Sequence, residues 1–206
     1  MKPVSSMFAC AVILACAASP VLAQDSAQIA QFGEGHHALI EQVSTAGNNS
    51  ATIYQGTGWY SGYGSQASVM QRNVDSSQVE VHQAGGGNNV MVAQYDGWNL
   101  TAHVNVESGW RGELGGYDNS VMIEQTGFDS FASVDQGSSA YSRAEIRQSG
   151  MGWGDGSGNR AEILQSGANN QASIQQSGSN FNAMIVQGNP GYGNSYGNSA
   201  FIRQTH

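Results

Sequence analysis

Ser77 to Gln94 read SQVEVHQAGGGNNVMVAQ, and this stretch contains two copies of one short pattern. In each copy a small or apolar residue is followed two positions later by a β-branched residue and after two more by glutamine, as in Val79-x-Val81-x-Gln83. A spacing of two places the three marked residues on one face of a β-strand. The residues between them are mostly polar and variable, which is typical of a solvent-facing side.

The same pattern recurs along most of the chain, and successive glutamines are often eleven or twelve residues apart. The glutamines of the thirteen copies are Gln31, Gln42, Gln55, Gln71, Gln83, Gln94, Gln125, Gln136, Gln148, Gln165, Gln176, Gln187 and Gln204. A fourteenth slot, Leu100-x-Ala102-x-Val104-x-Val106, lacks the glutamine. Evenly spaced strands with Gly- and Asn-rich turns predict an all-β fold, a two-sheet β-solenoid of about seven coils with two short strands per coil.

The repeated glutamine is expected to lie inside the solenoid. A buried amide is costly unless it is hydrogen bonded, but a glutamine at the same place in every coil can donate to one neighbouring coil and accept from the other. The polar residue two positions before the small residue is expected to do the same. It is serine in four copies and asparagine in six, namely Asn49, Asn88, Asn119, Asn159, Asn170 and Asn198. We assign these glutamines and asparagines to an assembly ladder along the solenoid axis.

The first 23 residues have a different composition. Lys2 precedes a short apolar run and the small-residue site Val21-Leu22-Ala23, in the order that is typical of a secretory signal peptide. We expect cleavage after Ala23, so that residues 1–23 are the signal peptide and residues 24–206 form the repeat domain. The stretch Ile13-Leu14-Ala15-Cys16 loosely resembles a lipoprotein processing site, which leaves lipidation of Cys16 open as an alternative.

Removal of the signal peptide would also remove the only lysine and both cysteines, Cys10 and Cys16. The remaining chain then has six arginines and fifteen acidic residues, a net charge of −9 with neutral histidines. Such a chain has no basic patch for nucleic acid, no disulfide and no thiolate ligand for a metal.

Residues that could carry chemistry are scattered rather than clustered. The five histidines are not spaced as metal ligands, and acids such as Glu80 and Glu124 fall at outward strand positions. The glycine-rich run from Gly150 to Gly158 occurs once, whereas calcium-binding repeats need copies in successive coils. We therefore expect no enzyme, no cofactor, no bound metal and no small-molecule substrate.

Two longer stretches resemble the curlin repeat. They are Ser77-x5-Gln83-x-Gly85-x2-Asn88-x-Val90-x3-Gln94 and Asn159-x5-Gln165-x-Gly167-x2-Asn170-x-Ala172-x3-Gln176. Curlins are the subunits of curli, the functional amyloid fibres on bacterial surfaces. The resemblance implies secretion by an outer-membrane machinery, polymerisation outside the cell with itself and a related curlin subunit, and roles in adhesion and biofilm matrix.

Both ends of the array are good copies of the repeat without room for a polar cap, so we expect head-to-tail stacking into filaments. Four long connections hold most of the Trp and Tyr residues, and Asp25 and His36 replace the expected Ser or Asn in the first two units. These departures leave open whether the chain is the main or the nucleating subunit. The alternative function is a monomeric, secreted β-solenoid that serves as an adhesin or binding module.

Overall fold

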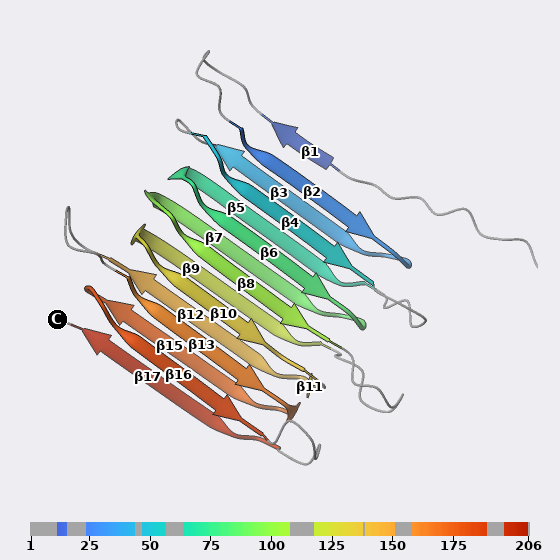
Figure 1. The fold of residues 1–206 in the computed structure, drawn as a ribbon. Helices are drawn as coiled ribbons and strands as arrows, with labels where there is room; N and C mark the ends of the chain where they lie inside the picture. Colours follow the sequence, from blue (N-terminus) through green and yellow to red (C-terminus); the bar gives the residue numbers. More distant parts are fainter. Residues whose placement is uncertain are drawn as a thin grey trace, which may run out of the picture.

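The computed structural model describes residues 12–15, 24–43, 47–56, 64–107, 118–137, 139–150, 158–188 and 196–205. These residues form β-strands and turns, and no helix among them is long and apolar enough to cross a membrane. The strands make two large parallel sheets, called sheet A and sheet B below. Figure 1 shows the strands stacked in sequence order, with β1 at one end and β17 at the other.

Sheet A has eight strands along the stacking axis. They are β1 (Val12–Ala15), β3 (His37–Val43), β5 (Gln66–Asp75), β7 (Asn89–Trp98), β9 (Ser120–Phe128), β12 (Arg143–Ser149), β15 (Gln171–Ser177) and β17 (Ser199–Thr205). Sheet B has seven strands. They are β2 (Ser26–Gln31), β4 (Ser50–Gln55), β6 (Gln78–Gln83), β8 (Thr101–Val106), β10 (Phe131–Asp135), β13 (Arg160–Gln165) and β16 (Asn182–Gln187). A two-stranded sheet pairs β11 (Ser139–Ala140) with β14 (Gly167–Ala168).

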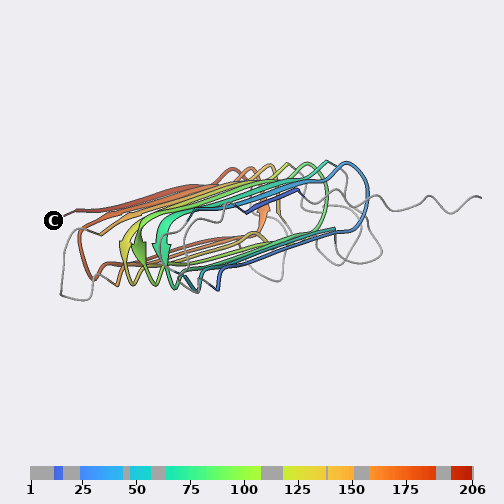
Figure 2. The ribbon, with the colours of Figure 1, turned by 90° about the horizontal axis from the view of Figure 1, so that it is seen from above.

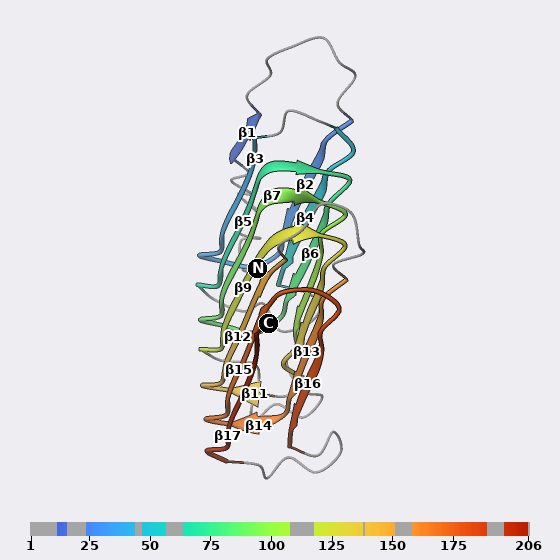
Figure 3. The ribbon, with the colours of Figure 1, turned by 90° about the vertical axis from the view of Figure 1, so that its left-hand side faces the viewer.

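Each coil of the solenoid contributes one strand to each sheet, so the first coil contains β2 and β3 and the last contains β16 and β17. The two sheets lie as two flat layers joined by turns in Figure 2. Figure 3 shows the coils following one another down the axis. The predicted two-sheet β-solenoid of about seven coils, with two short strands per coil, is confirmed.

Equivalent positions of the repeat stack directly on one another. Ile146 of β12, for example, is paired in register with Ile123 of β9 and Ile174 of β15. The alanine, valine and isoleucine positions point between the sheets and form one continuous core, and Ile123, Ile146 and Ile174 are fully buried. Each such side chain contributes about 1.5–3 kcal/mol of transfer free energy, and the small alanines let the two sheets pack closely.

The slot without glutamine forms a complete strand. Ala102, Val104 and Val106 of β8 are 0–1% exposed, so this coil is as well packed as its neighbours. Strands β5, β7 and β9 are longer than expected, because they continue past the glutamine into the corner of the coil. Gly97 and Gly127 stack there so closely that a Cβ atom on Gly97 would clash with the carbonyl oxygen of Gly127.

The sequence pattern did not predict β1, which lies inside the expected signal peptide. Residues 12–15 of β1 pair in parallel with residues 39–42 of β3 at the edge of sheet A. The rest of residues 1–23, including Cys16, lies outside the described residues, as do Trp59, Trp110 and Trp153 of the long connections.

At most corners, the residue directly before the Ser or Asn position of the repeat has a left-handed backbone conformation. These residues are Gly35, Asn48, Gly64, Ser76, Gly87, Asn99, Asp118, Asp129, Tyr141, Asn169, Asn180 and Gly197, with φ between 49° and 73°. Glycine and asparagine adopt this conformation at low cost, but a side chain such as tyrosine does so at a cost of about 1–2 kcal/mol. Tyr141 is 60% exposed, so little packing compensates for its strain.

The substitution Tyr141→Gly is therefore expected to raise the free energy of unfolding by about 1 kcal/mol. Urea unfolding of the monomer checks this value. Tyr95→Gly is the matched control, since Tyr95 lies within β7 at an ordinary backbone conformation, where glycine destabilises by about 0.5–1 kcal/mol. Destabilisation by both substitutions would show that the left-handed corner is not strained.

Candidate functional site

A continuous ladder of glutamine side chains runs through sheet A. In every step the Nε2 atom of one glutamine donates to the Oε1 atom of the glutamine in the next coil, at 2.8–2.9 Å. The seven members are Gln42, Gln71, Gln94, Gln125, Gln148, Gln176 and Gln204. All amides point the same way, so the ladder has a donor end at the C-terminal coil and an acceptor end at the N-terminal coil.

The Nε2 atoms of these glutamines also donate across to the opposite sheet. Gln148 of β12 donates to the carbonyl oxygen of Phe131 in β10 at 3.0 Å, and Gln176 of β15 donates to that of Arg160 in β13 at 3.1 Å. Both N–H groups of the amide are thus used inside the core. A buried hydrogen bond contributes about 0.5–1.5 kcal/mol, whereas an unpaired buried amide costs more than that. The glutamine therefore fixes both the stacking of coils and the pairing of sheets.

The glutamine ladder of sheet B is interrupted at Val106. Gln31, Gln55 and Gln83 form one segment and Gln136, Gln165 and Gln187 form another, with 2.7 Å between Nε2 and Oε1 at each step. Val106 occupies the position between them, paired in register with Gln83. Gln136 is fully buried, and its Oε1 atom has no hydrogen-bond partner among the described residues. The missing amide thus leaves a buried acceptor unsatisfied in the following coil.

The Asn and Ser positions form a second kind of row. Their side-chain oxygens accept a hydrogen bond from the backbone N–H of the equivalent residue in the next coil, as Asn119 does from Ser142 at 3.0 Å. In the same way Asn88 accepts from Asn119, Asn170 from Asn198 and Asn159 from Phe181. Amide-to-amide bonding was expected at these positions, and it forms between Asn198 and Asn170, where Nδ2 donates to Oδ1 at 3.1 Å. At Asn88, Asn119 and Asn159 the side-chain oxygen accepts from the backbone of the next coil.

The structure brings the thirteen glutamines and six asparagines of the expected ladder together in these rows. Asn49 accepts from the backbone N–H of Ser77, and Asp25 in turn accepts from the N–H of Asn49 at 3.0 Å. Asp25 departs from the repeat in sequence, yet its carboxylate accepts the same backbone hydrogen bond that an asparagine oxygen accepts in other coils. The hydrogen bonds to the opposite sheet were not predicted, because no sequence signal marks a backbone acceptor.

The outer face of sheet B carries a cluster of titratable side chains. His82 lies 2.7 Å from Glu80 and stacks on Tyr54, while Asp135 accepts from Asn105 at 3.5 Å. Burial raises the pKa of Asp135 above its ordinary value of 3.8, and the negative charge of Glu107 raises it further. In the part of the chain that the structure describes, no three His, Cys, Asp or Glu residues are arranged to hold a metal ion.

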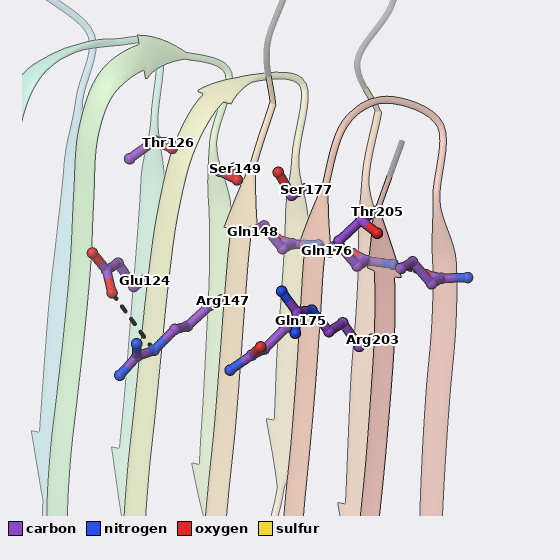
Figure 4. Close-up of a pocket in the computed structure, with 11 residues that line it drawn as sticks. Glu124, Thr126, Arg147, Gln148, Ser149, Gln175, Gln176, Ser177, Arg203 and Thr205 are labelled. Atoms are coloured by element: carbon purple, nitrogen blue, oxygen red, sulfur yellow. Dashed lines mark hydrogen bonds and ion pairs between the residues drawn. The ribbon is translucent and has the colours of Figure 1, made fainter.

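A shallow groove of about 340 Å³ crosses sheet A over β9, β12, β15 and β17. Figure 4 shows its hydroxyl row on neighbouring strands, formed by Thr126, Ser149, Ser177 and Thr205. Beside the hydroxyls lie Glu124, Arg147, Gln175 and Arg203. The groove is open, and Glu124 is the one acidic side chain among the residues that line it.

Comparison with known protein families gives a match for one segment of this solenoid. Residues 156–188 match the family model described as the curlin associated repeat. This segment contains β13 to β16 and the ladder residues Gln165, Gln176 and Gln187. The match confirms the predicted resemblance and supports a curlin-family relationship. A comparison with curated proteins found no match.

The substitution Val106→Gln is expected to join the two segments of the sheet B ladder. The new amide would donate to Oε1 of Gln136 and accept from Nε2 of Gln83, which should raise the free energy of unfolding by about 1 kcal/mol. Denaturant unfolding of the monomer measures the change.

Val104→Gln is the matched control for this substitution. Val104 is equally buried in the same strand, but its register partners are Val81 and Val134, so a glutamine there finds no amide. We expect a loss of about 2–4 kcal/mol. Equal destabilisation by the two glutamines would contradict the role given to the ladder.

The raised pKa of Asp135 makes a pH-dependent prediction. The folded state binds the proton of Asp135 more tightly than the unfolded state does. The contribution of the protonated carboxyl group to the free energy of unfolding is therefore complete below pH 3.8, and it is lost as the pH rises through the folded-state pKa. Asp135→Asn should therefore be more stable than the parent at neutral pH, with no advantage at the acidic end. Unfolding midpoints measured across this pH range test the prediction. Asp96→Asn, at an exposed position of β7, is the control for charge removal. A constant difference at all pH values would contradict the assignment.

Proposed function

We propose that the chain is a structural subunit of extracellular, curli-like amyloid fibres that grow by head-to-tail stacking of solenoids. In this proposal the protein is not an enzyme, and it acts in surface adhesion and biofilm matrix. The observation that carries the proposal is the one-way glutamine ladder, which ends at both faces of the solenoid with groups suited to each other. The curlin repeat at residues 156–188 supports the same assignment.

The two end faces are complementary in their hydrogen bonds. At the C-terminal face, Gln187 and Gln204 have the Nε2 atoms that elsewhere in each ladder donate to the next coil. At the N-terminal face, Gln31 and Gln42 have the Oε1 atoms that elsewhere accept from the preceding coil. Head-to-tail contact places donors against acceptors, whereas contact between two N-terminal faces places acceptors against acceptors.

The strands at the two ends also offer backbone groups for pairing. β16 and β17 are edge strands at one end of their sheets, and β2 is the edge strand at the other end of sheet B. β3 is covered by β1 over four residues only. Removal of residues 1–23 by a signal peptidase would therefore expose the full edge of β3, and open edges of this kind pair readily with another chain.

Secretion and partners follow from the curlin relationship. We infer export across the outer membrane by a dedicated machinery, with the bacterial cell surface as the site of assembly. The partners are then further copies of the chain and a related curlin subunit. The groove over β9 to β17 favours the second candidate function, a monomeric secreted binding module, because such a module needs an exposed surface for its ligand.

The proposal predicts that purified residues 24–206 polymerise after removal of denaturant. Thioflavin fluorescence should rise after a lag. The lag should disappear when preformed fibres are added. Fibre diffraction should give reflections at about 4.7 Å along the axis and about 10 Å across it. A soluble monomer that persists for days under these conditions would favour the binding module instead.

Ser199→Pro tests the direction of growth. Gln171, the equivalent residue one coil earlier, donates its backbone N–H to Asn198 of the last coil at 2.7 Å. The N–H of Ser199 therefore points toward the next copy, and proline at this first position of β17 removes only that donor. We expect a folded monomer with slowed fibre growth. Gln171→Pro is the contrasting variant, since it removes a bond used within the chain and should destabilise the monomer.

A further inference from the structure

The outer face of sheet A carries a row of residues, called the charged row below, that starts with an acid and ends with a base. Its members, one per coil in register, are Glu41, Met70, Ala93, Glu124, Arg147, Gln175 and Arg203. Four of them lie side by side on neighbouring strands in Figure 4. Neighbouring strands are about 4.8 Å apart, so side chains in adjacent coils of this row can touch.

An ion pair already forms between adjacent coils within this row. Nε of Arg147 lies 3.8 Å from Oε2 of Glu124, and their strands β12 and β9 are paired in register at these two residues. Arg147 also bonds to Glu145 of its own strand at 2.8 Å. The row geometry therefore permits an arginine and a glutamate to meet across one strand spacing.

The two ends of the row differ from Arg147 and Glu124 in the part of the chain that the structure describes. Among the described residues, neither Glu41 nor Arg203 forms an ion pair, in contrast to Arg143, Arg147 and Arg160. When β17 of one copy stacks in register on β3 of the next, Arg203 falls opposite Glu41, one strand spacing away. Phe201 then falls opposite Leu39, and these two side chains are 59% and 41% exposed in the single copy.

The charges of the whole end coils agree with this contact. The first coil contains Asp25, Glu34 and Glu41 and no arginine, whereas Arg203 is the only Asp, Glu, Lys or Arg residue between positions 182 and 205. Contact between two N-terminal faces would bring six carboxylates together. Contact between unlike faces brings the arginine to the acids.

We propose that Arg203 of one copy and Glu41 of the next form an intermolecular ion pair that sets the register and direction of stacking, beside an apolar contact of Phe201 with Leu39. This inference rests on the proposed head-to-tail assembly and adds the side chains that recognise the second copy. The glutamine ladders favour contact between unlike faces, but they do not distinguish the end coils from most other coils, because the same amides recur along the axis. The outer row supplies that selection.

A charge swap in residues 24–206 tests the pair. Glu41→Arg and Arg203→Glu each place like charges at the junction, and each should slow seeded elongation about three- to tenfold at low salt. The double variant E41R/R203E restores opposite charges and should return to within about twofold of the parent, since both single losses come from one pair. Raising the salt to about 1 M should reduce the single-variant effects, because the Debye length falls to about 3 Å.

Arg72→Glu is the matched control, as it makes the same charge change on the outer face of sheet A but outside the charged row. Fibres of this variant should elongate at the parental rate. The monomers of all variants should have the same circular dichroism spectrum. A double variant as slow as the slower single variant, or single variants no slower than Arg72→Glu, would overturn the ion pair while leaving head-to-tail assembly intact. A parent that does not elongate at all would overturn the proposed function itself.

Discussion

Everything in this solenoid depends on the need to satisfy a buried primary amide in each of thirteen strands. The core between the sheets is made of alanine, valine and isoleucine and offers these amides no polar side chain except the next glutamine along the axis. An amide there must therefore find its partner one strand spacing away, in the coil before or after. This requirement fixes the register wherever two glutamine-bearing strands pair, and it fixes the direction of the ladder.

The sequence predicted the fold well because the period of two and the recurring glutamine are properties of single strands. It predicted the coil count, the inward side of each strand and the slot without glutamine that ends at Val106. It could not predict that Gln136 would carry the unsatisfied oxygen, since this depends on the direction in which all the amides point. Nor could it predict that the asparagine oxygens would accept from the backbone N–H of the next coil, because no sequence signal marks a backbone donor. The pairing of β1 with β3 joins segments that share no repeat and is visible only in three dimensions.

The inner and outer residues of each strand have separate roles. The inner rows are nearly identical from coil to coil, so they stabilise stacking without distinguishing one coil from another. The outer rows vary, and they hold the ion pairs, the Tyr54–His82 stack and the contact of Arg160 with the ring of Phe131. Evolution of such a chain can alter what the surface contacts while leaving the interior unchanged, because alternate residues of a strand face opposite sides.

The valine at position 106 has a consequence on a larger length scale. In the proposed polymer, strands repeat every 4.8 Å or so, but the gap in the sheet B ladder returns only once per subunit, after seven coils or about 34 Å. The backbone of such a fibre would be uniform along the axis, but the gap at Val106 would mark each subunit at a regular interval. One row of amides would run unbroken through many subunits, while the other would be divided into six-residue blocks that each span a junction, from Gln136 of one copy to Gln83 of the next. The boundary between molecules would then be one of the better bonded places along the axis, and the mechanically weakest plane would lie inside each subunit.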